Sequence, residues 1–420
     1  MKINTVRFIL LAAFLFSLMY FNKEKIPRPQ ELKTFDFILS SGIDIKLDDS
    51  DNKNNEFSIS YISREINDSE ENVQNANKNL FNVKANTLNK AYDKLHNLTN
   101  KSLNDSHLEY ILLGEETAKE NLAYFIDYYS RSASVRLCVN AFITKDMKSE
   151  DFIQKILTSK IDADAKLDGI VNNKNQLSSM TKTNLKDIMQ IFYSDNKTGL
   201  IPALSVRESP IKNTKNSKEN KQNEENDEND DKEKEEKNYT FEFDGLGIIK
   251  DGKLTEYIPQ YLVRSYIILT GTLTITDIEI TDENGDLVVF SVKNSKNRVY
   301  FEFDDFNVPK KVIFDINIDT QFDETTSKKD IFSSDNIDKL NKLQSDKIKS
   351  EIEKITELSK KTNADFLNIG KCLSVRHPYK WHDIKDDWSE IFKNIDYEIN
   401  VNAKMKRMQN TNIKQREQEQ

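Results

Sequence analysis

The sequence predicts an α+β fold of several domains, in which a mixed α/β amino-terminal domain precedes a carboxy-terminal domain that combines an antiparallel sheet with a long helix. Three observations lead to this prediction. Residues 30–207 alternate between strand-like and helix-like patterns, and residues 208–237 contain almost no apolar side chain. Residues 271–408 contain hairpin signals followed by a helical stripe, and an apolar segment in residues 1–25 predicts a membrane anchor ahead of the folded part.

The elements predicted for the amino-terminal domain follow from the spacing of its apolar residues. Alternation with a period of two indicates strands, and apolar residues three or four positions apart indicate helices. Gly114 ends one predicted strand, and Glu115 begins the next predicted helix with an acid in its first turn, where the helix dipole favours negative charge. Strands are predicted at residues 31–45, 57–62, 107–113 and 135–144, and helices at 80–98, 115–129, 151–157 and 184–192.

Residues 208–237 interrupt this pattern with the charged run KNTKNSKENKQNEENDENDDKEKEEK. A segment with so few apolar side chains cannot bury enough surface to offset its conformational entropy, so a disordered linker is predicted. We interpret its charges as those of a solvated linker. A specific acidic interaction tail is the alternative interpretation.

After the linker, residues 238–270 are predicted to form a small middle domain, residues 271–408 the carboxy-terminal α+β domain, and residues 409–420 a disordered tail. Asp251-Gly252 and Asn284-Gly285 are turn signals typical of hairpins. A long helix with an apolar stripe is expected to cover one face of the sheet. The expected strands are 239–249, 254–257, 273–281, 287–293, 299–306, 311–320 and 395–405, and the expected helices are 260–269, 336–360, 364–375 and 380–392.

The amino terminus places basic Lys2 and Arg7 before an apolar run at residues 8–21, which is the pattern of a secretory signal or a signal-anchor. At 1.5 Å per residue the run spans about 21 Å, against roughly 30 Å for a bilayer core. No small-x-small cleavage site follows it, so an uncleaved anchor is predicted in preference to a cleaved signal. The predicted anchor residues are Phe8, Leu11, Phe14, Phe16, Leu18 and Phe21.

Composition argues against several functions. At a net charge of -9 the chain lacks the overall basic footprint that phosphate binding needs and no local basic patch stands out, so no nucleic-acid partner is predicted. Cys138 and Cys372 are the two cysteines, too few for a disulfide-stapled scaffold, and both are expected to be small buried side chains. His377 and His382 are five positions apart, which does not place both imidazoles on one helical face. No catalytic residue, metal site or cofactor is predicted.

Trp381 and Trp388 are seven positions apart and share a helical face with Ile384 and Phe392. We interpret this apolar stripe as core packing. In the alternative interpretation the stripe is an anchor for a partner subunit, and Trp381, Trp388 and His377 are partner-facing.

Short motifs in residues 347–407 carry a specific resemblance. A long charged helix is followed by an alternating final strand, and between them lie Asn363-Ala364-Asp365-Phe366, His377-Pro378-Tyr379-Lys380-Trp381 and Trp388-Ser389-Glu390-Ile391-Phe392. In order and spacing, these motifs resemble the end of the spore germinant-receptor C-subunit family, known as Ger(x)C. A looser likeness includes FILSSGID at 37–44 and SHLEYILLGE at 106–115, so the resemblance covers roughly residues 31–407.

The resemblance implies an extracytoplasmic three-domain α/β subunit, with no known catalytic residue, at the spore inner membrane. Such a subunit would work beside a multi-span A subunit and a permease-like B subunit in sensing small germinants. Family members usually carry a lipobox cysteine, whereas the first cysteine here is Cys138. Gln30-Glu31-Leu32 also stands in place of the usual Arg-Glu opening.

The sequence therefore predicts a non-catalytic subunit of a spore germinant receptor that acts in nutrient-triggered germination with A and B subunits. A single amino-terminal helix would hold it to the membrane in place of a lipid. The alternative is a generic membrane-anchored scaffold or binding protein on the outer side of the cell envelope. Direct binding of a small molecule is left open by the sequence.

Overall fold

The structure is a computed structural model of the chain. It describes residues 35–46, 56–64, 78–99, 101–120, 122–132, 134–159, 163–172, 183–209, 238–271, 276–327 and 333–407. The predicted anchor, most of the predicted linker and the predicted tail lie outside these ranges. Among the described residues, no helix is long and apolar enough to cross a membrane.

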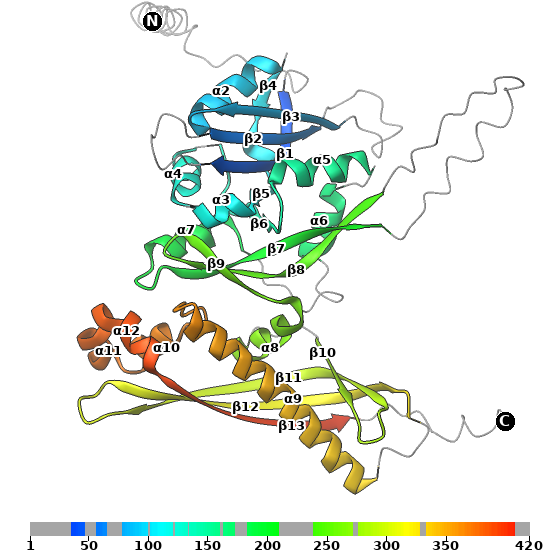
Figure 1. Cartoon of the computed structure of the whole chain (residues 1–420), viewed down its shortest axis with the longest axis vertical. Coiled ribbons are helices and arrows are strands. Elements are labelled where there is room, and N and C mark those ends of the chain that lie inside the picture. Colours follow the sequence, from blue (N-terminus) through cyan, green and yellow to red (C-terminus); the bar gives the residue numbers. More distant parts are fainter. Residues whose placement is uncertain are drawn as a thin grey trace, which may run out of the picture.

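The amino-terminal half is built on a sheet to which the described residues contribute nine strands (Figure 1). These are β1 (Phe35–Lys46), β2 (Glu56–Arg64), β3 (Lys78–Ala85), β4 (Ser102–Asn104), β5 (Tyr110–Gly114), β6 (Asn140–Thr144), β7 (Thr198–Glu208), β8 (Tyr239–Lys250) and β9 (Lys253–Ile258). Their order is β3-β2-β1-β5-β6-β7-β8-β9, with β4 beside β1. The central strands β1, β5, β6 and β7 are parallel, whereas both flanks of the sheet pair antiparallel.

Helices cover both faces of this sheet. They are α2 (Leu88–Leu98), α3 (Glu115–Glu120), α4 (Ala123–Arg131), α5 (Ser149–Thr158), α6 (Ala163–Asn172) and α7 (Leu185–Tyr193). Leu95, Phe125 and Ile188 bring α2, α4 and α7 into one buried apolar cluster. Phe152 and Leu167 bring α5 and α6 into another. Every residue of β5 is buried, as expected for a parallel strand with helices on both sides.

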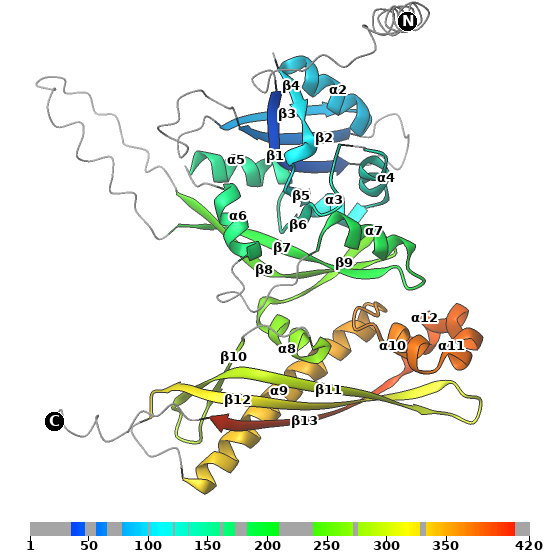
Figure 2. The ribbon, with the colours of Figure 1, turned by 180° about the vertical axis from the view of Figure 1, so that it is seen from behind.

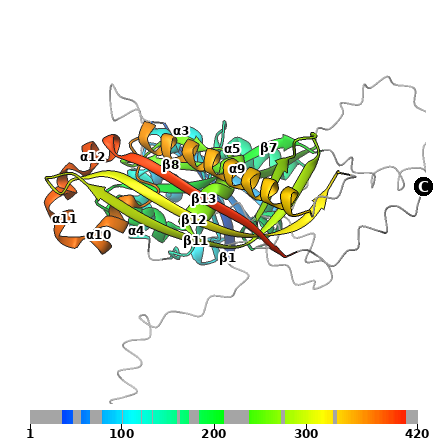
Figure 3. The same ribbon diagram turned by 90° about the horizontal axis from the view of Figure 1, so that it is seen from below.

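The carboxy-terminal half is built on a second sheet, of order β10-β11-β12-β13. Its strands are β10 (Thr276–Thr281), β11 (Leu287–Phe303), β12 (Pro309–Thr325) and β13 (Asp396–Arg407). The helices of this half are α8 (Gln260–Thr270), α9 (Ser334–Lys361), α10 (Ile369–Arg376), α11 (Pro378–Ile384) and α12 (Trp388–Asn394). Ile348, Ile352 and Ile355 place the apolar stripe of α9 in the buried core with the sheet. Figure 3 shows α10, α11 and α12 gathered at one end of the sheet.

The α+β fold class, with a sheet and a long helix in the carboxy-terminal domain, is confirmed, but the last strand differs from a purely antiparallel sheet. β13 pairs parallel to β12, because α9 to α12 lie between the two strands in the chain and return it to the same end. β13 is an edge strand, and α9 covers part of that edge. The backbone N–H of Ala403 donates to Ser345 Oγ and that of Met405 donates to Asn341 Oδ1, each at 2.9 Å. A covered edge is protected from pairing with another chain.

Two predicted element boundaries are wrong for identifiable reasons. The predicted helix at 80–98 is a strand, β3, in its first part, and α2 begins only after Thr87, whose hydroxyl accepts from the backbone N–H of Lys90 at 3.2 Å. The predicted strands at 287–293 and 299–306 are one strand, β11. The polar residues Ser295 and Asn297 lie where a break between two strands was expected. Their side chains donate to backbone carbonyls of α8, and the strand continues through them.

Other elements were harder to predict. Residues 135–139 form a turn, so β6 is shorter than the strand predicted at 135–144 and Cys138 is exposed, contrary to expectation. Cys372 is half-buried on α10. No strand was predicted at β7. This strand contains Pro202, and proline is unusual within a sheet. The predicted helix at 380–392 is divided into α11, a short 3-10 turn (Lys385–Asp387) and α12.

The two halves meet at α8. Residues 238–258 add β8 and β9 to the first sheet, whereas α8 packs against the second (Figures 1 and 2). Leu246 from β8, Ile258 from β9, Leu262 from α8 and Ile352 from α9 belong to one continuous buried cluster. The apolar core therefore passes from one half to the other. The division into domains predicted from the sequence stays a prediction.

Gln344 on α9 predicts an unusual mutational effect. Its side chain is fully buried, and neither its amide nitrogen nor its amide oxygen has a hydrogen-bond partner among the described residues. A buried polar group without a partner costs about 1–3 kcal/mol. Gln344→Leu is therefore expected to raise the free energy of unfolding by about 1–2 kcal/mol in a urea titration. The control is Gln260→Leu, at an exposed helical position; a clear destabilisation by Gln344→Leu would contradict the interpretation.

Candidate functional site

The first candidate site lies at the carboxyl ends of the parallel strands β1, β5 and β6. Asp44, near the end of β1, accepts hydrogen bonds at the amino terminus of α5. Its Oδ1 accepts from the backbone N–H of Ser149 at 2.9 Å, and its Oδ2 accepts from Ser149 Oγ at 2.8 Å and from the backbone N–H of Glu150 at 3.0 Å. The preceding residue Lys148 gives no side-chain cap, so β1 supplies the cap from a distant part of the chain.

This position is one where open α/β sheets commonly bind ligands, and helix amino termini there attract anions. Here a carboxylate of the chain itself already occupies the amino terminus of α5. Asp44 is the last residue of the segment 37–44 that resembles the Ger(x)C family, and its structural role is to cap α5. The arrangement fastens β1 to α5.

Gly114 and Gly42 leave the space that this junction needs. A Cβ atom on Gly114 would lie 2.0 Å from Asp44 Oδ1. A Cβ atom on Gly42 would lie 2.7 Å from Ser149 Oγ and 2.8 Å from Ile153 Cδ1. Neither position accepts a side chain unless its neighbours move.

Gly114→Ala is accordingly expected to lower the free energy of unfolding by about 1–3 kcal/mol, because the added methyl group displaces Asp44 from the cap of α5. Chemical denaturation followed by circular dichroism measures this loss. Gly169→Ala is a matched control, since Gly169 lies in α6 with nothing within 4 Å of the added atom. Because alanine favours helix, the control should be neutral or slightly stabilising; equal effects of the two changes would refute the packing argument.

Glu115 connects the same junction to α3. Its side chain is buried, the backbone N–H of Asp146 donates to its Oε2, and Lys119 Nζ lies 2.6 Å from its Oε1. Burial favours a higher pKa for Glu115, but the hydrogen bonds from Lys119 and from the Asp146 backbone outweigh it and hold that pKa below its usual value. Glu115 therefore stays ionised and holds the turn after β6 against α3.

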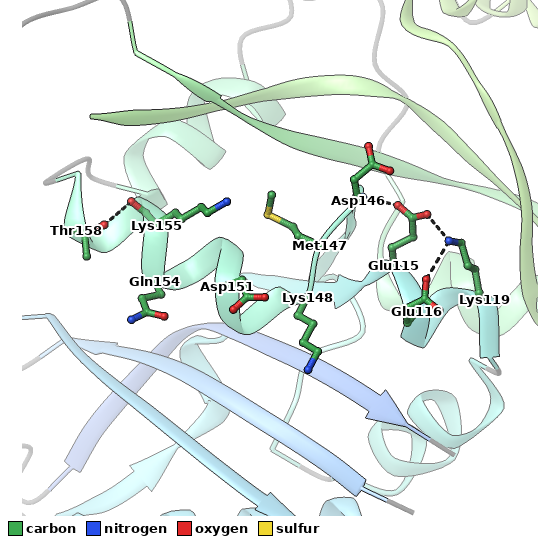
Figure 4. Close-up of a pocket in the computed structure, with 10 residues that line it drawn as sticks. All are labelled: Glu115, Glu116, Lys119, Asp146, Met147, Lys148, Asp151, Gln154, Lys155 and Thr158. Atoms are coloured by element: carbon green, nitrogen blue, oxygen red, sulfur yellow. Dashed lines mark hydrogen bonds and ion pairs between the residues drawn. The ribbon is translucent and has the colours of Figure 1, made fainter. Parts of the chain in front are cut away.

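A polar trough of about 810 Å³ lies beside this junction (Figure 4). In Figure 4 the network of Glu115, Glu116 and Lys119 lies at one end, and Lys155 of α5 lies towards the other. The lining contains acids and lysines together, without a nucleophile held by an adjacent base. Among the described residues, no group of three or more histidine, cysteine, aspartate and glutamate side chains could hold a metal ion.

The second candidate site is centred on Asp365, from the Asn-Ala-Asp-Phe motif. Its Oδ1 accepts from the backbone N–H of Ile369 at 2.7 Å, and its Oδ2 accepts from that of Gly370 at 2.8 Å. The same Oδ2 accepts from the Trp388 indole N–H and from Asn196 Nδ2, each at 3.2 Å. Asp365 thus caps α10, holds α12 through Trp388 and reaches the amino-terminal half through Asn196.

The surroundings of Asp365 shift the pKa of its carboxyl group. Burial raises its pKa to about 6, and the donors from Gly370, Ile369 and Trp388 and the charge of Lys250 oppose the rise. Lys250 also donates to the backbone carbonyl of Asn196 at 3.0 Å. The contact between the halves is therefore polar on this side, whereas at α8 it is apolar.

The three residues weighed as partner-facing lie together at this end of the molecule. Trp388 is only 4% exposed and belongs to the core, with Trp381 edge-on to it at a centroid distance of 5.2 Å. His377 is half-buried, with its ring edge-on to Phe301 and Phe303. Contact of these three residues with a partner stays a prediction. The predicted anchor residues Phe8, Leu11, Phe14, Phe16, Leu18 and Phe21 lie outside the described part of the chain.

Sequence reasoning did not single out Asp44, Asp365 or Asn196 as site residues. The quoted motifs contain the first two, so the motifs were a usable signal for them. Asn196 lies outside every motif and is 169 positions from its partner Asp365, so nothing local in the sequence indicates the contact.

Both sites lie in regions that match known family models. Residues 28–206 match the family model described as "Spore germination protein N-terminal domain". Residues 244–409 match the model described as "Spore germination B3/ GerAC like, C-terminal". The chain belongs to the Ger(x)C family of spore germination proteins. Asp44 thus lies in the region that matches the first model, and Asp365 in the region that matches the second.

Two individual proteins are similar to this Ger(x)C chain. "Spore germination protein B3" of Bacillus subtilis (strain 168) is 22% identical over 170 residues, which make up 39% of this chain and 44% of that protein. The match thus spans less than half of the relative's length. The crystal structure of the GerBC protein has a TM-score of 0.52 at 16% identity and covers 87% of this chain and 97% of its own, which shows the shared fold.

Proposed function

We propose that this chain is a non-catalytic, membrane-anchored subunit of a spore germinant receptor, acting in nutrient-triggered germination with A and B subunits. The observation that carries the proposal is the succession of two spore germination domains over residues 28–206 and 244–409. Family membership makes the chain a spore germination protein of the C-subunit type.

The two candidate sites support a non-catalytic role. The charged groups at the Asp44 and Asp365 junctions cap helices and join elements, so they are used in holding the structure. The proposed location is the extracytoplasmic face of the spore inner membrane, with residues 1–25 as the single anchor. The partners are the multi-span A subunit and the permease-like B subunit implied by the resemblance.

Spores that lack this chain test the proposal. The deletion is expected to abolish or strongly slow the response to at least one nutrient germinant, measured as the fall in optical density of a spore suspension. Expression of the full chain should restore the response. Normal germination with every germinant tested, in a strain without a second copy of this family, would refute the receptor role.

The anchor has a separate test. A chain that begins after residue 25 is expected to leave the membrane fraction of spores, and a heterologous transmembrane helix in place of residues 1–25 should return it. Full retention of the shortened chain in the membrane fraction would show that another part of the protein, or a partner, holds it there.

A further inference from the structure

A polar cleft lies between the two halves, lined by the end of α7 and by residues of α10 and α11. Its volume is about 420 Å³, which suits a small molecule. The amino-terminal half contributes the end of α7 and the residues after it, including Tyr193 and Asp195, and the carboxy-terminal half contributes Asp365, Lys371 and Trp381. Clefts between domains are common places for ligands.

A second, smaller cavity of about 90 Å³ shares Asp195, Asn196 and Asp365 with the cleft. Asn363 also lines this smaller cavity, and its Oδ1 is buried without a hydrogen-bond partner among the described residues, while its Nδ2 donates to Ser389 Oγ at 2.7 Å. A buried acceptor without a donor costs free energy.

The charges that line the larger cleft favour a cation. Asp187, Asp195 and Asp365 oppose the single cation Lys371. Asp187 is used in the capping box of α7, and Asp365 already has four donors. Asp195 is exposed and has no hydrogen bond or ion pair within the described part of the chain, so its carboxylate is available to a ligand.

Aromatic side chains complete the lining. Tyr193 is 77% exposed on the amino-terminal side, and Trp381 is half-buried on the other. Aromatic faces attract ammonium groups, and a carboxylate forms charge-assisted hydrogen bonds with them. A free carboxylate and aromatic surface thus lie together in the larger cleft, whereas Lys250 and Lys385 line the smaller cavity.

We propose that the cleft between the two halves binds a small molecule with a protonated amino group. Asp195 provides the opposite charge, and Trp381 and Tyr193 provide aromatic surface. A ligand in this position contacts both halves and therefore favours one arrangement of the two. Binding is a property of the cleft and does not require the proposed receptor role.

Tryptophan fluorescence gives a direct readout, because the two tryptophans of the chain, Trp381 and Trp388, line the cleft and the smaller cavity. The full chain in detergent is titrated with four three-carbon probes: propylamine, β-alanine, propionate and propanol. Saturable changes are expected with propylamine and β-alanine, and none with propionate or propanol. Failure of both amines to bind, or equal binding of propionate, would overturn the proposal.

Variants then locate the binding. Asp195→Asn is expected to weaken propylamine binding at least tenfold, since it removes the available carboxylate. Asp383→Asn is the matched control, because Asp383 lies on α11, has an 80% exposed side chain and does not line the cleft. Binding that Asp195→Asn leaves unchanged would contradict the assignment. If Asp195→Asn spores germinate normally, the proposed receptor role is unaffected. If deletion spores germinate normally, the receptor role is refuted but the proposed amine binding is not.

Discussion

Glu351→Ala is expected to lower the free energy of unfolding by about 3–5 kcal/mol, because it leaves the charge of Arg264 without its partner between α8 and α9. Glu351 is 3% exposed. Its Oε2 accepts from Arg264 Nε at 3.1 Å and from Ser265 Oγ at 2.5 Å, and its Oε1 accepts from Arg264 Nη2 at 2.5 Å. Arg264 Nη1 also donates to the backbone carbonyl of Asp277 in β10 at 3.2 Å.

These contacts join three elements of the carboxy-terminal half through one guanidinium group. Loss of Glu351 removes both hydrogen bonds of the bidentate pair, which are stronger than those between neutral groups. Glu353→Ala is the control, since Glu353 is exposed on the same helix. The double variant Arg264→Met with Glu351→Leu should recover most of the loss, because an apolar pair can replace a buried ion pair. A loss of unfolding free energy below about 1 kcal/mol in Glu351→Ala is typical of exposed ion pairs, and it would show that the Arg264–Glu351 pair contributes little.

Asp365→Ala is expected to have the second largest effect, a loss of about 3 kcal/mol or more, because each buried donor left without an acceptor costs about 1–3 kcal/mol. The change leaves the backbone N–H groups of Ile369 and Gly370, the Trp388 indole and Asn196 without their shared acceptor. The expected result is a lower urea midpoint and a red-shifted tryptophan emission as Trp388 gains contact with water. Asp383→Ala, at an exposed position on α11, should change neither quantity.

The pH dependence of the Asp365→Ala effect follows from the pKa of about 6 in the folded protein, which is above the usual value of 3.8. Between these two values the folded state holds a proton that the unfolded state has released, so this group stabilises the fold most at low pH and the contribution falls as pH rises towards 6. The stability difference between the wild type and Asp365→Ala should therefore be larger at pH 4.5 than at pH 7. A difference that grows with pH would contradict the raised pKa.

The sequence predicted the elements that carry a long, regular pattern. α9 was predicted at 336–360 because its apolar residues recur at helical spacing over seven turns, and the structure has it at Ser334–Lys361. One error occurs where two patterns join without a glycine or proline. β3 and α2 follow each other with only two residues between them, and the capping residue Thr87 was the one local signal of the change.

The candidate sites were predictable only in part, for a physical reason. The motifs mark Asp365, but they do not say that its carboxylate reaches Asn196 in the other half. Asp44 and Ser149 are 105 positions apart, and their contact depends on β1 lying next to β5 in the sheet. Contacts of this kind are set by strand order, which local spacing does not encode.

Isolation of the tagged full chain from spore membranes is the most direct test of the receptor role. We expect the chain to bring with it a multi-span A subunit and a permease-like B subunit, in a complex that withstands washing in mild detergent. The same isolation with the Asp365→Ala variant shows whether the partners are still recovered when the contact between Asp365 and Asn196 is lost. Recovery of the intact chain without either membrane partner, from spores in which both are present, would contradict the account.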